Sequence, residues 1–72
     1  MNDYEAYNRQ IEALRTMAKK KHHYSDGMLA PHIKSSVSGL RNKSSTHTLP
    51  DMPFWKVVQL ARLCGGDVEI KF

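Results

Sequence analysis

The first third of the chain carries apolar side chains at spacings of three and four residues. Such a stripe falls on one face of an α-helix and is incompatible with the period of two expected for a strand. Acidic residues lie in its N-terminal half and Lys19, Lys20 and Lys21 in its last turn, as the helix dipole favours. The pattern therefore predicts an amphipathic helix over residues 3–21. Its apolar face consists of Tyr4, Tyr7, Ile11, Leu14 and Ala18.

Two shorter helices are predicted next, after a turn signal at 25–27. The first of them reaches Ile33 and contains Pro31, which a helix tolerates only in its first turn. That helix therefore begins near Asp26 or, alternatively, at Pro31 itself. The next helix is predicted over 35–43. Its cap is Ser35 or Ser36, and its inward-facing side chains are Val37 and Leu40.

The last part of the chain contains a loop over 44–53, a fourth helix over 54–64 and a terminal segment with strand character. The glycine pair at 65–66 ends the helix, because glycine takes the left-handed conformation without steric cost. Residues 67–72 alternate polar and apolar side chains, which predicts a short β-strand. The apolar face of the fourth helix is Phe54, Val57, Val58, Ala61 and Cys64.

These elements predict an all-α fold: four helices in a single domain over 1–72, followed by a short C-terminal β-strand. A core from 72 residues is small, and such chains commonly gain stability from a partner subunit or a metal. Cys64 is the only cysteine, so an internal disulfide is excluded. The polar N-terminus and the lack of a long apolar run lead us to expect a soluble, cytoplasmic protein without a membrane partner.

Charge is concentrated in the middle of the chain. The formal net charge is +4, and between positions 15 and 43 the only acid is Asp26. This balance predicts contact with a polyanion; the alternative is an ordinary solvated face. The cations in this span are Arg15, Lys19, Lys20, Lys21, Lys34, Arg41 and Lys43.

Two segments, 37–43 (VSGLRNK) and 60–72 (LARLCGGDVEIKF), resemble the recognition helix and the closing helix, glycine stop and strand of the lambda-repressor-like (Cro-type) helix-turn-helix family. The resemblance implies sequence-specific binding of duplex DNA, transcriptional regulation in a phage or mobile element, and a homodimer formed through Asp67–Phe72. One departure is clear: Val37 follows Ile33 by four positions instead of seven, so the turn is shortened or displaced.

A recognition helix needs small or polar side chains where its backbone enters the major groove, and the third helix carries them. Cations at its end suit phosphates or a guanine edge. The alternative is a surface helix of ordinary polar residues. The expected DNA-binding residues are Lys34, Ser35, Ser36, Ser38, Gly39, Arg41, Asn42 and Lys43. A second set, Lys19, Lys20 and Lys21, either contacts the DNA backbone or only caps the first helix.

A different class of function remains open, in which the same scaffold binds a protein, as an inhibitor or antitoxin does. Trp55 would then belong to an interface with Phe54, instead of the core. No catalytic residues, cofactor, metal or small-molecule substrate are expected. The histidines and Cys64 lack ligand spacing, and no phosphate-binding glycine loop is present.

Overall fold

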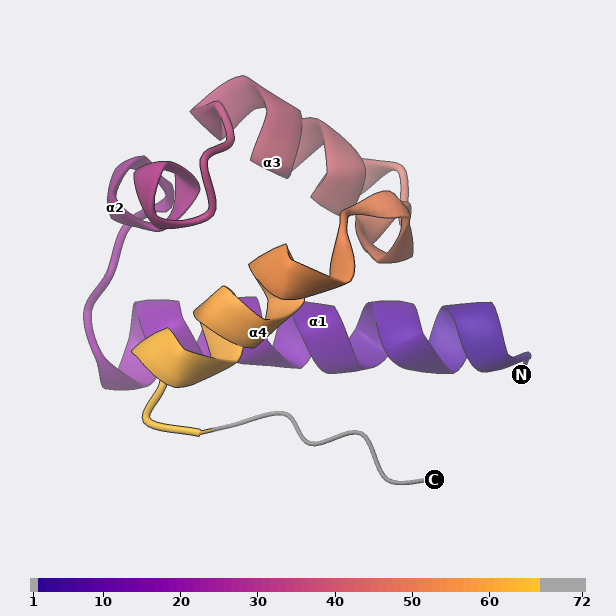
Figure 1. Ribbon diagram of the computed structural model, residues 1–72, viewed down its shortest axis with the longest axis horizontal. Coiled ribbons are helices and arrows are strands. Elements are labelled where there is room, and N and C mark those ends of the chain that lie inside the picture. The colour runs from indigo at the N-terminus through magenta and orange to yellow at the C-terminus, as the bar shows by residue number, and fades with distance from the viewer. Residues whose placement is uncertain (1, 67–72) are drawn as a thin grey trace.

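The computed structural model describes residues 2–66, and within them the regular structure is entirely helical (Figure 1). The predicted all-α class and its four helices are confirmed, and the predicted strand over 67–72 lies outside the described residues. In the described part of the chain, no helix is both long and apolar enough to cross a bilayer. The elements are α1 (Asp3–Lys21), α2 (Asp26–His32), α3 (Val37–Ser45), the 3-10 turn η1 (Leu49–Asp51) and α4 (Phe54–Leu63).

The helices surround one small core. In Figure 1, α1 runs along the bottom with α4 in front of it, α3 spans the top, and α2 is seen nearly end-on at the left. α2 and α3 therefore cross steeply, and only residues 33–36 separate them. Lys34 adopts a left-handed conformation in this turn, with a φ of 51°.

Each helix contributes at least one large side chain to the core. Leu40 is the buried residue of α3, so the opposite side of that helix faces solvent. Burying a leucine or isoleucine contributes about 1.5–3 kcal/mol, and a core of this size holds few of them. The largest fully buried side chains are Ile11, Leu29, Ile33, Leu40, Leu49 and Leu60.

Local sequence signals set the limits of α2 and α3. α2 begins at Asp26, which decides between the two predicted starts, and it ends one residue after Pro31, whose missing N–H removes a helical hydrogen bond. α3 is capped by Ser36, whose hydroxyl accepts a hydrogen bond from the Gly39 N–H at 3.0 Å. The predicted range of 35–43 is therefore two residues too early, and the predicted loop over 44–53 begins only after Ser45 and contains η1.

Two side chains predicted to face inward are exposed instead. Tyr4 is 43% exposed and Phe54 is 42% exposed. Each lies in the first turn of its helix, at the edge of the core, and the Tyr4 hydroxyl donates to Asp51 at 2.9 Å. Trp55 is 45% exposed, so it is not a core residue.

Candidate nucleic-acid interface

The outer face of α3 is polar. Ser36, Ser38, Arg41 and Asn42 are exposed, while Leu40 points into the core. Small side chains stand at the start of the helix because Ser36 caps it and Ser38 follows in the first turn. A helix with this outer face has the shape that a DNA groove accepts.

A buried carboxylate lies beneath this face. Asp26, at the first position of α2, is only 4% exposed. Its Oδ1 accepts from Arg15 Nε at 3.1 Å, and its Oδ2 accepts from Arg15 Nη2 at 3.0 Å. The same Oδ2 accepts from Lys19 Nζ at 3.2 Å and from Arg41 Nε at 3.1 Å. One acid is therefore surrounded by three cations.

Two further side chains extend this cluster toward the end of α3. Arg15 Nη1 donates to Glu12 Oε1 at 2.9 Å and to Ser44 Oγ at 2.7 Å, and Ser44 donates to Glu12 Oε2 at 2.7 Å. We call the whole cluster the Asp26 network. It links α1, α2 and α3, and it consists of Glu12, Arg15, Lys19, Asp26, Arg41 and Ser44.

The pKa of Asp26 reflects this environment. Burial alone would raise it, but hydrogen bonds from Arg15, Arg41 and Lys19, together with the charge of Arg15, lower the pKa from 3.8 to about 2. The carboxylate is therefore ionised at neutral pH, and its charge is compensated within the protein.

Acid should weaken the fold through this group. A carboxyl whose pKa is lower in the folded state stabilises the fold fully above its unfolded pKa, here 3.8, and that contribution is lost as pH falls through about 2. The difference corresponds to about 2 kcal/mol. Urea unfolding at pH 5 and at pH 2 measures this. The native protein should exceed Asp26→Asn in free energy of unfolding by about 2 kcal/mol more at pH 5 than at pH 2. A constant difference between the two proteins across this range would contradict the expectation.

Arg41 is attached to the network at one end only. Its side chain is 66% exposed, and its Nε is bonded to Asp26. Within the part of the chain that the structure describes, the two terminal nitrogens of Arg41 have no hydrogen-bond partner. Arg41 is thus both held in place and available to a ligand.

Exposed cations lie at the end of α1 and in the turn before α3. Lys20, Lys21 and Lys34 are exposed there, and the end of α1, α2 and the 33–36 turn all lie at the left of Figure 1. From position 16 to position 50 the only acid is Asp26, which is already paired. We refer to Lys19, Lys20, Lys21 and Lys34 as the basic end.

The expected DNA-binding residues differ in how far the structure exposes them. Ser35 is half-buried and accepts a hydrogen bond from Lys56 Nζ at 2.9 Å, and Lys19 is bonded to Asp26. Gly39 and Lys43 are half-buried. The exposed members are Lys19, Lys20, Lys21, Lys34, Ser36, Ser38, Arg41 and Asn42.

Sequence reasoning missed the residues that hold this face together. The sequence places Arg15 among the cations, Asp26 at a helix start and Glu12 among the acids that suit the helix dipole, and it gives no role to Ser44. One signal was present: a single acid in a long stretch of cations. Such an acid is a good candidate for a buried partner, because an unpaired charge is rarely buried.

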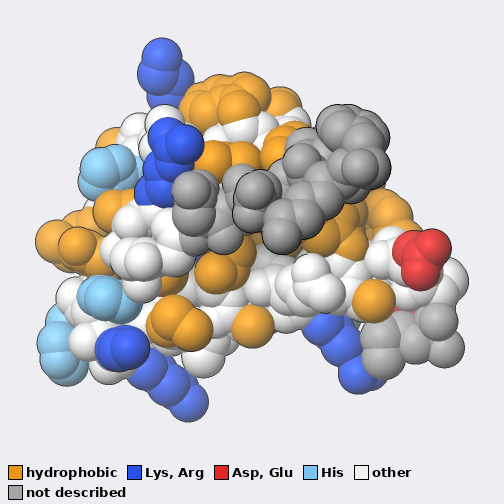
Figure 2. All heavy atoms as spheres, turned by 60° about the horizontal axis from the view of Figure 1, so that its bottom comes forward, with side chains coloured by type: hydrophobic (Ala, Val, Ile, Leu, Met, Phe, Trp, Pro, Cys, Tyr) orange, Lys and Arg blue, Asp and Glu red, His pale blue; other side chains and the backbone are white. Residues whose placement is uncertain are grey.

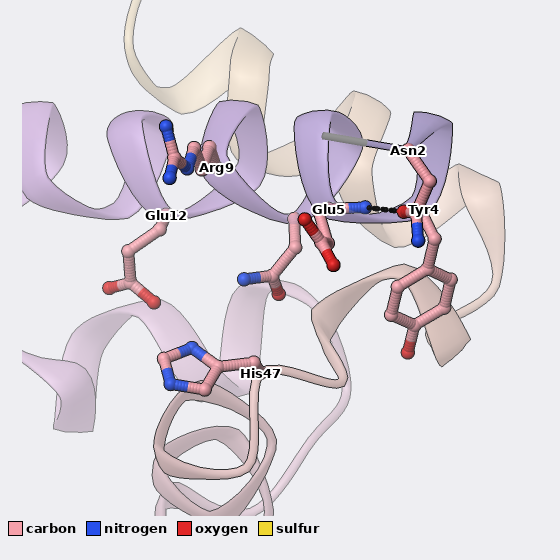
Figure 3. A pocket seen from close by; sticks show the side chains of 7 residues that line it. Asn2, Tyr4, Glu5, Arg9, Glu12 and His47 are labelled. Atoms are coloured by element: carbon pink, nitrogen blue, oxygen red, sulfur yellow. Dashed lines mark hydrogen bonds between the residues drawn. The ribbon is translucent and has the colours of Figure 1, made fainter.

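A cleft of about 640 Å³ lies at the other end of α1. Figure 3 shows Glu12, from α1, and His47, from the segment after α3, on opposite walls. The amide oxygen of Asn8, which is buried, accepts from the Leu49 N–H at 3.2 Å. The lining of the cleft mixes both signs of charge, so the cleft is less suited to a polyanion than the basic end is. The lining residues are Asn2, Tyr4, Glu5, Asn8, Arg9, Glu12 and His47.

The surface around α1 is also mixed. Figure 2 brings forward the side that lies at the bottom of Figure 1, and it shows hydrophobic side chains in several places with Lys and Arg side chains at the edges.

No family model, no curated protein and no solved structure matches this chain.

Proposed function

We propose that this protein binds duplex DNA, with α3 lying in the major groove and α2, the 33–36 turn and α3 acting as a helix-turn-helix unit. The observation that carries the proposal is the outer face of α3, where Arg41 projects into solvent while Asp26 holds its Nε. This face is polar, narrow at its N-terminal end and free of uncompensated acids.

The local geometry supports this unit. Helix-turn-helix units join two steeply crossing helices by a turn of about three or four residues. Residues 33–36 connect α2 and α3 in this way. Lys34, within this turn, adopts the left-handed conformation that turns commonly give to glycine.

The electrostatic arrangement supports contact with phosphates. Lys20, Lys21 and Lys34 are exposed on the side where α3 begins, and the N-terminus of a helix also favours anions. These contacts would position the protein on DNA, and the face of α3 would read the bases.

By resemblance, the role would be transcriptional regulation, as a Cro- or repressor-like protein of a phage or mobile element. A single module of this size makes few contacts, so tight binding to a two-fold operator calls for a homodimer. Asp67–Phe72, the segment expected to form the dimer contact, lies outside the described residues.

Binding to duplex DNA should depend steeply on salt. The logarithm of the affinity is expected to fall linearly with the logarithm of salt concentration, and Lys20→Ala should reduce that slope by about 1 for all sequences alike. Fluorescence anisotropy with a labelled duplex at several salt concentrations measures this. Arg9→Ala is the matched control, because Arg9 is an exposed cation at the cleft end. Binding that does not respond to salt would contradict the proposed phosphate contacts.

A second candidate function is supported by the start of α4. Phe54 and Trp55 are neighbours and both are exposed, and exposed aromatic side chains are common at protein interfaces. In this case the chain binds a protein. Pull-down from a lysate with and without nuclease separates the two functions, since only a DNA-mediated association is lost on digestion.

A further inference from the structure

Arg41 is an exposed cation of α3 that is held by a buried carboxylate. Its Nε donates to Asp26 Oδ2 at 3.1 Å, although 66% of its side chain is exposed and Asp26 is 4% exposed. The guanidinium is therefore anchored from the protein side, and the remainder of the group stands in solvent.

The anchor itself is rigid. Arg15 holds both oxygens of Asp26 with two hydrogen bonds, a fork-to-fork pair that fixes the plane of the carboxylate. Lys19 adds a third cation. Because Asp26 is buried and surrounded by positive charge, it presents little negative potential to a nearby phosphate.

The guanidinium geometry then limits what Arg41 can recognise. The group is planar and its N–H donors point in fixed directions. With Nε occupied, the two terminal nitrogens offer a pair of parallel donors. In the major groove, guanine presents two adjacent acceptors, O6 and N7, whereas adenine pairs one acceptor with a donor.

We infer that Asp26 fixes the edge of Arg41 that faces the groove, and that the DNA bound by this protein carries a guanine opposite Arg41. Asp26 is thus a positioning residue for base recognition. The inference rests on the proposed DNA binding, and it adds which base is read and which buried group makes the reading specific.

A selection from randomised duplexes tests this with the native protein, Arg41→Lys and the control Arg9→Lys. Lysine keeps the charge but loses the fork, so Arg41→Lys should retain the salt dependence of binding and lose its guanine preference. For duplexes that differ at that position, we expect the preference for guanine over adenine to fall by roughly 5- to 150-fold. Arg9→Lys should behave like the native protein.

The outcomes separate the inference from the proposed function. The inference is wrong, and DNA binding stands, if Arg41→Lys keeps the guanine preference of the native protein. The same holds if the native protein selects a DNA sequence in which no guanine preference is lost on replacing Arg41. If the native protein enriches no duplex and shows no salt-dependent binding, both are wrong.

A measurement on the free native protein tests the anchor without DNA and without a destabilised variant. The Nε proton of Arg41 should exchange with water more slowly than that of Arg9, an exposed residue with no hydrogen bond from its guanidinium to other described residues. NMR of the arginine side chains resolves the two protons. Equal exchange rates would mean that Asp26 does not hold Arg41, and the inference would be wrong whatever the DNA result.

Discussion

Asp26→Asn is expected to lower the free energy of unfolding by about 3 to 5 kcal/mol, because it removes the acid that three cations share and leaves Glu12 as the acid paired with Arg15. Arg15 is affected most, since its side chain is only 12% exposed and cannot regain full hydration. Lys19 and Arg41 are more exposed and can return to solvent. The asparagine also removes a negative charge from the first turn of α2, where the helix dipole favours one.

Urea unfolding followed by circular dichroism measures this loss. A domain of this length has a total stability of roughly 4 to 11 kcal/mol, so the change removes about a quarter of it or more. Asp51→Asn is the matched control: Asp51 is exposed and accepts one hydrogen bond from Tyr4, and its replacement should cost about 1 kcal/mol or less. Equal effects of the two substitutions would mean that the Asp26 network does not stabilise the fold.

The parts of this fold that sequence predicts well are governed by neighbouring residues. The apolar stripe of α1, the Ser36 cap and the limits of α4 each depend on side chains within one or two helical turns. The same periodicity misplaces Tyr4 and Phe54, because a helical stripe continues past the point where the core ends.

The candidate site depends on contacts that sequence patterns do not encode. Asp26 meets Arg15 across 11 positions and Arg41 across 15, and Ser44 meets Glu12 across 32. The charge count indicates a basic stretch of the sequence, but it counts Arg41 and Lys19 as free cations. In the folded chain both are shared with Asp26, which changes Arg41 from a mobile charge into an oriented group.

The spacing of the 33–36 turn illustrates the same limit. From sequence, the four-residue step from Ile33 to Val37 suggested a shortened or displaced turn. In the structure this step is a compact connection in which Lys34 has a positive φ and Ile33 is fully buried. A left-handed lysine has no signature in composition or hydropathy, because among the common residues it is glycine that takes this conformation routinely.

Leu40→Ala is expected to lower the free energy of unfolding by about 2 to 5 kcal/mol and to loosen α3 before the rest of the protein. Leu40 is 1% exposed and is the buried residue of α3. The half-buried Val37 also packs on the core, and Arg41 and Ser44 join α3 to the Asp26 network. Removing the leucine leaves a cavity beneath the face proposed to bind DNA. We therefore expect the loss of stability to be largest in α3, which has a single fully buried apolar side chain.

Hydrogen exchange of backbone amides measures where the loss falls. In Leu40→Ala, amides of α3 should exchange faster relative to those of α1 than they do in the native protein. Leu63→Ala is the matched control, because Leu63 is half-buried at the end of α4; it should cost less stability and leave the relative protection of α3 unchanged. Equal loss of protection in α1 and α3 for Leu40→Ala would show that the domain unfolds as one unit and that α3 is no more weakly held than the rest.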